Sequence, residues 1–290
     1  MDLWQALILG VVEGLTEYLP VSSTGHLLIV QRLLGIESTP AANAYAIVIQ
    51  AGAILAVLGL YRKRVGEMLL GLVGRSPAGR GLLWALLAAF VPAAVIGFLF
   101  DKAIERLLFG PWPIVAAWAA GGVLLVFVGR RLIGREGLSI EQVPPRLAVL
   151  IGLAQCSALW PGVSRSMATI LGGVAVGLSL GAAVEFSFLL GLITLGAATV
   201  YKLASAGKVL LASYGLLPLA VGFVAAWLSA VLAVRWMVAW LNGHGLGVFG
   251  WWRLSAAALV TLWLCTAPAS HEPAAGAGRR ASLALALGAP

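Results

Sequence analysis

The chain has 290 residues, of which 61% are hydrophobic and only 10% are charged. Soluble domains carry about 25% charged residues, so this composition excludes an ordinary soluble protein. The net charge of +8 does not indicate a nucleic-acid partner, because most basic residues stand in short segments between apolar stretches, where they orient a membrane protein.

Six apolar stretches are long enough to cross a bilayer, which takes about 20 helical residues. In chain order they lie near residues 42–61, 81–100, 113–131, 183–202, 213–238 and 247–266. Residues 1–266 are therefore expected to form a single membrane domain. The tail, residues 267–290, is rich in Ala, Gly and Pro, and we expect it to be disordered and without function.

Two further apolar regions, 4–36 and 147–180, are each interrupted by polar and helix-breaking residues. The first interruption runs from Pro20 to His26 (PVSSTGH), and the second from Pro161 to Ser166 (PGVSRS). Irregular backbone at membrane depth is tolerated only inside protein or along a watery cavity. The sequence therefore predicts an all-α integral membrane protein with six transmembrane helices and two re-entrant helical hairpins, whose breaks share one polar cavity.

The two interrupted regions also match each other in sequence. The matches pair GVVE, from Gly10, with GLAQ, from Gly152, and then Pro20 with Pro161 and Ser23 with Ser164. Three crossings in each half are an odd number, so the halves, about 1–135 and 143–266, are predicted to form an inverted repeat. In such proteins the ligand site lies at the repeat interface near the midplane.

Charge in the connecting segments predicts the orientation. Segments 61–80 and 130–146 carry an excess of arginine and lysine, whereas segment 101–106 is balanced. Because cytoplasmic loops are enriched in basic residues, the two basic segments are expected in the cytoplasm and both termini outside.

Two carboxylates precede the first break. Glu13 and Glu17 are four residues apart and share one helix face among apolar neighbours. Two close carboxylates in a low dielectric do not both ionise unless a cation sits with them. That cation could be a metal ion or Arg165.

Both breaks carry hydroxyl side chains in front of a half-helix. Ser22, Ser23 and Thr24 form an N-cap arrangement in the first, and Ser164 and Ser166 flank Arg165 in the second. Half-helix N-termini present free N–H groups that suit phosphate, and the arginine fork can bind two phosphate oxygens.

Three other polar residues, His26, Gln155 and Glu185, have several roles open to them. His26, close to Ser23, could be a general acid or base or a nucleophile. Gln155 holds the position of Glu13 in the second repeat and is expected to hydrogen-bond inside the cavity. Glu185 either pairs with Arg165 or sits at an interface, and tryptophans near span ends, such as Trp252, are typical of an interfacial belt.

These motifs resemble those of the undecaprenyl-diphosphatase family, the bacitracin-resistance proteins of bacterial inner membranes. The resemblance covers GVVEGLTEYLPVSSTGH (Gly10 to His26), QCSALWPGVSRSMAT (Gln155 to Thr169) and EFSFLLG (Glu185 to Gly191). It implies removal of one phosphate from undecaprenyl diphosphate on the periplasmic side, with a divalent cation, Mg²⁺ or Ca²⁺. The implied partners are the polyprenyl diphosphate lipid and the membrane, with a possible homo-oligomer.

By motif match the expected catalytic residues are Glu13, Glu17, Ser23, His26 and Arg165, with Glu13 and Glu17 holding the metal. The residues expected to bind substrate are Ser22, Thr24, Gly25, Gly162, Ser164, Ser166 and Gln155.

The expected mechanism has Ser23 attack the terminal phosphorus while His26 takes the hydroxyl proton. Attack by His26 or by water fits the same residues. A transporter or flippase of the lipid phosphate is the main alternative, because inverted repeats with broken helices are a transporter architecture. A lipid-binding protein without chemistry is the other.

Overall fold

A computed structural model describes residues 1–37, 39–241 and 243–266. The regular structure in these residues is helical; they contain no β-strand, only one isolated bridge between Leu138 and Leu178. The tail, for which the sequence predicts disorder, lies outside the described residues.

Within the described residues, six helices are long and apolar enough to cross a membrane. They are α3 (Pro40–Leu60), α5 (Pro77–Leu108), α6 (Pro111–Gly129), α9 (Leu180–Tyr214), α10 (Leu216–Leu241) and α11 (Gly247–Thr266). The predicted all-α membrane fold is confirmed. One boundary is wrong: the stretch predicted to begin at residue 213 begins at Leu216, because α9 continues to Tyr214 and turns at Gly215, whose φ is 73°.

Each interrupted region folds as two short helices. The first gives α1 (Leu3–Thr16) and α2 (Ser23–Leu33); the second gives α7 (Pro145–Cys156), the short η3 (Ser157–Leu159) and α8 (Arg165–Ala175). The longest of them, α1, has 14 residues and is about 21 Å long at 1.5 Å per residue, less than the roughly 30 Å hydrocarbon core. Each pair therefore turns back, and the loops, not the helices, reach the middle.

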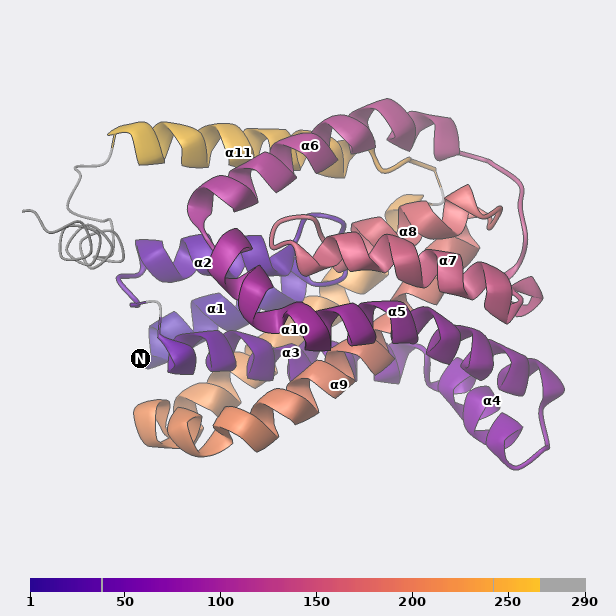
Figure 1. Cartoon of the computed structure of the whole chain (residues 1–290), viewed down its shortest axis with the longest axis horizontal. Coiled ribbons are helices and arrows are strands. Elements are labelled where there is room, and N and C mark those ends of the chain that lie inside the picture. Colours follow the sequence, from indigo (N-terminus) through magenta and orange to yellow (C-terminus); the bar gives the residue numbers. More distant parts are fainter. Residues whose placement is uncertain (38, 242, 267–290) are drawn as a thin grey trace, which may run out of the picture.

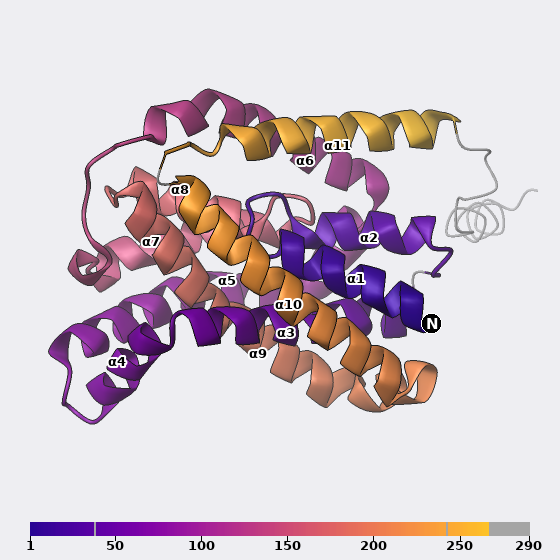
Figure 2. The ribbon, with the colours of Figure 1, turned by 180° about the vertical axis from the view of Figure 1, so that it is seen from behind.

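The two hairpins enter the molecule from opposite ends. The α1–α2 hairpin lies at the end that carries the N-terminus and the α7–α8 hairpin at the end that carries α4 (Arg62–Leu72), so their loops approach each other near the centre (Figures 1 and 2). This arrangement fits an inverted repeat, whose proposed boundaries stay a prediction.

The first helix of each hairpin packs along one long helix. In the first half α1 packs along α10, and in the second α7 packs along α5, while α3 pairs with α9 and α6 with α11. Glycines allow this close approach: a Cβ at Gly10 would overlap the carbonyl oxygen of Gly222, and one at Gly152 would overlap that of Ala89.

The basic segment after α3 is not a plain loop, because it forms α4. There Arg64 lies 2.7 Å from Glu141, in the short η2 (Ile140–Gln142), and 2.7 Å from Glu185 in α9. The pairing of Glu185 with Arg165 that the sequence left open is therefore wrong. This ion-pair cluster joins three segments at the end of the molecule opposite the N-terminus (Figure 1).

Two glycines of α3 provide a matched test of the packing. A Cβ at Gly52 would overlap the backbone of α10 at Phe223, whereas Gly59 faces open space. We expect Gly52→Ala to lower the free energy of unfolding by about 1–3 kcal/mol through overpacking. Gly59→Ala should raise it, by at most about 1 kcal/mol, through helix propensity. Thermal unfolding in detergent measures both, and shifts of the same sign would contradict this packing.

Candidate functional site

The two hairpin loops line one cavity of about 890 Å³, which α5 and α9 complete. The first hairpin contributes Glu17, Ser22, Ser23 and Thr24, and the second contributes Gln155, Gly162, Ser164 and Arg165. Much of the remaining wall is apolar, and the exposed side chains of Phe98 and Tyr201 stand along it. The cavity therefore joins a polar end to an apolar groove between α5 and α9.

The helices that follow the two loops begin in the same way. Ser22 and Ser164 have φ values of 74° and 78°, and they are the only non-glycine residues with positive φ in the described part of the chain. The Oγ of Ser22 accepts from the N–H of Gly25 (3.4 Å), and the Oγ of Ser164 accepts from that of Met167 (3.2 Å). Backbone strain of about 1–3 kcal/mol, repeated at both loops, is typical of a functional site.

Glu17 joins the two hairpins through its two oxygens. Its Oε1 accepts from Nη2 of Arg165 at 2.9 Å, and its Oε2 accepts a short hydrogen bond from the hydroxyl of Ser23. Glu17 and Arg165 are largely buried, with 4% and 10% of their side chains exposed. The carboxylate of Glu17 thus contacts both the hydroxyl of Ser23 and the guanidinium of Arg165. The two motifs that supply Glu17 and Arg165 lie 148 residues apart in the sequence.

Arg165 has further support around its guanidinium. Nη1 donates to the carbonyl oxygen of Ser187 at 2.9 Å, and the Cζ atom lies 5.2 Å from the centre of the Tyr18 ring. A Cβ at Gly191 would lie only 2.8 Å from Nη1 and Nη2, so a glycine is needed there to make room. These contacts fix the guanidinium at the polar end of the cavity.

Glu13 is fully buried one helical turn before Glu17, and neither of its oxygens has a hydrogen-bond partner among the described residues. Gln155 of the second hairpin accepts from the hydroxyl of Thr194 at 3.4 Å, and its Nε2 also has no hydrogen-bond partner among the described residues. The described residues contain no cluster of three His, Cys, Asp or Glu side chains that could hold a metal ion. A cation here would therefore need oxygens from a ligand or water besides those of Glu13.

No hydrogen bond joins His26 to Ser23 in the described part of the chain. Its Nδ1 lies 2.7 Å from the carbonyl oxygen of Ser22, and its Nε2 accepts from the indole N–H of Trp252 at 3.0 Å. Because a carbonyl only accepts, the proton of the neutral ring sits on Nδ1. In this geometry the hydroxyl of Ser23 donates to Glu17 and not to His26, so the hydrogen bonding does not support the expected transfer of its proton to His26. The assignment of Trp252 to an interfacial belt is also incomplete, because its indole N–H donates to His26.

The four predicted site residues that do not line the cavity are Glu13, Gly25, His26 and Ser166. Gly25 packs against the indole ring of Trp118, and a Cβ at Gly25 would lie only 2.9 Å from atoms of that ring. Ser166 is fully buried and donates to the carbonyl oxygen of Leu19 at 2.9 Å, so it fastens the second hairpin to the first loop.

One residue at the loops, Arg253 of α11, was not predicted from the sequence. It is fully buried, and its guanidinium donates to carbonyl oxygens of both loops. The available signal was an arginine inside an apolar span, which is expensive and usually functional.

Comparison with known proteins gives one consistent family. Residues 6–259 match the family described as bacitracin resistance protein BacA. A protein of Sorangium cellulosum named undecaprenyl-diphosphatase is 48% identical over 265 residues, covering 90% of this chain and 86% of its own.

Relatives with the same name come from Methylococcus capsulatus (45% identical) and Ectopseudomonas mendocina (44%). Each alignment covers 88% of this chain and 92% of the relative. The matched region contains both hairpin loops and every residue that lines the cavity. The chain therefore belongs to the bacitracin resistance protein BacA family.

Proposed function

We propose that this chain hydrolyses undecaprenyl diphosphate to undecaprenyl phosphate and inorganic phosphate. That reaction would recycle the lipid carrier for cell-wall synthesis and confer bacitracin resistance. The observation that carries the proposal is the contact of Glu17, Ser23 and Arg165 at the polar end of a cavity with an apolar groove. The names of the relatives supply the substrate.

In the proposed mechanism the Oγ of Ser23 attacks the terminal phosphorus and gives its proton to Glu17. The new bond is Oγ–P, the bond that breaks joins the phosphorus to the bridging oxygen, and undecaprenyl phosphate leaves. Glu17 passes this proton to the departing undecaprenyl phosphate and is a carboxylate again. It then takes a proton from the water that attacks the phosphoserine, and returns it to the Oγ of Ser23 as the O–P bond breaks and inorganic phosphate leaves. Arg165 and the N–H groups at the start of α2 and α8 stabilise the charge on the transferred group.

Attack by His26 and a role without chemistry are less well supported. Attack by His26 would require its ring to give up the contact with Ser22 or with Trp252. A transporter or a passive lipid-binding protein needs an anion site but no hydroxyl hydrogen-bonded to a buried carboxylate, and the relatives carry the name of a phosphatase. Direct attack by water, with Glu17 as base, uses the same residues and differs only in forming no phosphoserine.

Phosphate release from undecaprenyl diphosphate by the purified protein in detergent tests the function and the nucleophile together. Ser23→Ala should lower kcat by at least about 100-fold, about 2.7 kcal/mol of transition-state stabilisation. His26→Gln, which keeps an amide able to donate and accept, should lose no more than about tenfold. An active Ser23→Ala protein beside an inactive His26→Gln protein would reverse the assignment, and a wild-type protein that releases no phosphate would refute the function.

We also propose that a divalent cation, Mg²⁺ or Ca²⁺, acts with the substrate. Glu13 is the better candidate ligand, because the oxygens of Glu17 are occupied by Ser23 and Arg165. Since Glu13 is buried one helical turn behind Glu17 and does not line the cavity, its carboxylate would have to turn toward the polar end to meet the cation. Mg²⁺ commonly binds one or two carboxylates together with substrate phosphates, which fits a single free carboxylate. Such a cation would neutralise charge on the diphosphate oxygens.

This cation site predicts a specific kinetic change. Glu13→Gln keeps the shape of the side chain but removes its charge, so the Mg²⁺ concentration for half-maximal activity should rise at least about tenfold. The measurement is a Mg²⁺ titration after chelation with EDTA, with Glu13→Asp as the control that keeps a carboxylate. An unchanged Mg²⁺ requirement in Glu13→Gln would remove Glu13 from the proposal.

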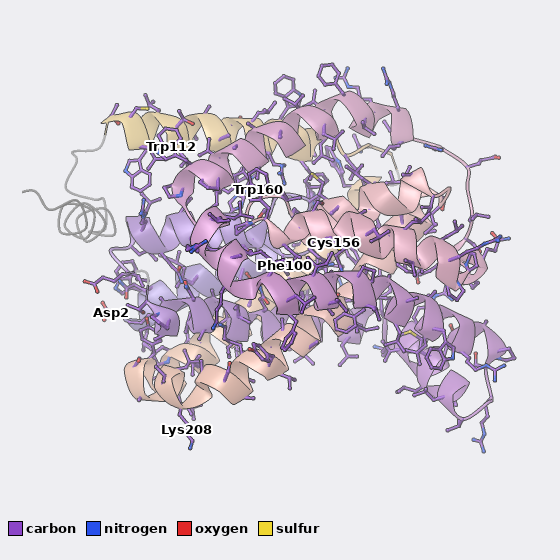
Figure 3. All side chains as sticks on the ribbon, in the orientation of Figure 1. Asp2, Phe100, Trp112, Cys156, Trp160 and Lys208 are labelled. Atoms are coloured by element: carbon purple, nitrogen blue, oxygen red, sulfur yellow. The ribbon has the colours of Figure 1, made fainter. Side chains whose placement is uncertain are left out.

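We propose that the protein lies in the bacterial inner membrane with the cavity open to the periplasm. The basic helix α4 lies at one end of the molecule, and Asp2, Trp112 and Lys208 lie at the other (Figure 3). Basic loops favour the cytoplasm, so the end with Lys208 is the periplasmic one. The possible homo-oligomer stays a prediction.

Cysteine labelling tests this orientation. In a background of Cys156→Ala and Cys265→Ala, a membrane-impermeant maleimide should label Lys208→Cys in intact cells. Lys63→Cys, in α4, should react only after the cells are lysed. The opposite pattern would place the cavity on the cytoplasmic side.

A further inference from the structure

Arg253 carries a charge into the interior without an acidic partner. Its side chain is fully buried in α11, and no carboxylate lies within ion-pair distance of it in the described part of the chain. A buried cation in a membrane protein is costly unless polar groups replace its water. Four backbone carbonyl oxygens replace the water around the guanidinium of Arg253. Their positions in the fold indicate the role of Arg253.

Three of the four carbonyls belong to the loops of the two hairpins. Nη1 donates to Pro20 at 3.3 Å in the first loop and to Val163 at 3.1 Å in the second. Nη2 donates to Gly162 of the second loop at 2.8 Å and to Ala117 of α6 at 2.7 Å. One guanidinium therefore holds both loops together and anchors them to the α6–α11 pair.

Arg253 contacts the loops on the side away from the cavity. Gly162 and Ser164 line the cavity, whereas Arg253 does not. In a trans peptide the C=O and N–H groups point in opposite directions, and the peptide between Val163 and Ser164 gives its oxygen to Arg253. Its N–H, on Ser164, is thereby turned away from Arg253, and no hydrogen bond within the described residues uses it.

That N–H belongs to the strained start of α8. Ser164 is in the left-handed region with φ of 78°, and the next two N–H groups, of Arg165 and Ser166, are the free donors of the helix N-terminus. Successive N–H groups in such a conformation form an anion-binding concavity. Because Arg253 binds the carbonyl oxygen of Val163, it fixes the orientation of the Val163–Ser164 peptide and so of the Ser164 N–H, the first donor of this set.

We propose that Arg253 is a positioning residue of the phosphate site, which acts from behind both loops to aim their backbone N–H groups into the cavity. The inference rests on the proposed function, since the group that those N–H donors meet is the transferred phosphoryl group. Arg253 does not touch that group. It should therefore affect the rate of the reaction more than the binding of the lipid, most of which lies elsewhere in the membrane.

A glycine on α6 makes the guanidinium position specific. A Cβ at Gly121 would overlap Nη2 of Arg253, so the guanidinium occupies the place of that missing side chain. Gly121→Ala therefore displaces the guanidinium while leaving Arg253 and its charge in the protein. It complements Arg253→Lys, which keeps the charge but offers one nitrogen in place of the two that reach four carbonyls.

The experiment compares wild type, Arg253→Lys and Gly121→Ala, with Gly59→Ala as a matched glycine control in open space. Each purified protein is assayed for kcat and KM on undecaprenyl diphosphate, and hydrogen–deuterium exchange is followed in peptides from both loops and from α3. We expect kcat to fall at least about tenfold in Arg253→Lys and Gly121→Ala, with KM within about threefold. Exchange should rise in both loops but not in α3, and Gly59→Ala should keep the wild-type kcat, KM and loop exchange.

The outcomes separate the inference from the function on which it rests. A wild-type protein that releases no phosphate removes the function, whatever the variants do. With an active wild type, Arg253→Lys and Gly121→Ala proteins that keep full kcat and unchanged loop exchange overturn the positioning role. So does faster exchange throughout the protein, or loss of folding in both variants, because either result would make Arg253 a residue of general stability.

Discussion

The ion pair between Glu17 and Arg165 is the contact on which the site depends. It joins the α1–α2 and α7–α8 hairpins, which enter from opposite ends and share no covalent connection near the centre. Either charge alone at this depth would be strongly unfavourable, so each makes the burial of the other possible. The pair also gives the carboxylate two partners at once, because the second oxygen of Glu17 receives the hydroxyl of Ser23.

Irregular backbone at membrane depth brings a second requirement, which is that its polar groups find partners inside the protein. The serine hydroxyls cap the helices that follow each loop, and Ser166 bonds back to Leu19. Arg253 takes up carbonyl groups on the remaining side. These bonds hold the loops to each other and to α11, and the N–H of Ser164, which no hydrogen bond among the described residues uses, stays free for a phosphate.

Much of this arrangement could be predicted from the sequence, for reasons that are local. A proline and a cluster of hydroxyls inside an apolar stretch predict a broken helix, and two such breaks with carboxylates and an arginine predict one shared site. The partner of Ser23 could not be predicted, because Glu17 and His26 both lie within reach along the chain and only the loop conformation decides between them.

The roles of Trp252 and Arg253 depend on a contact between the last spanning helix and loops more than 80 residues away. Nothing in the local pattern around an arginine in an apolar span says which carbonyls it will meet. The same limit applies to Glu185, which pairs with Arg64 rather than with Arg165. Tertiary contacts of single charged residues were thus the part of the structure that spacing did not determine.

The groove between α5 and α9 has a consequence for how the protein meets its substrate. Small residues such as Ala94, Gly97 and Ala198 form its walls, and the exposed rings of Phe98 and Tyr201 stand at its side. A long hydrocarbon chain can lie in such a groove with most of its length still among lipid tails, so it need not leave the bilayer to react. Encounter is then diffusion in two dimensions, and the quantity that sets the rate is the surface density of the lipid in its leaflet, not its concentration in the surrounding water.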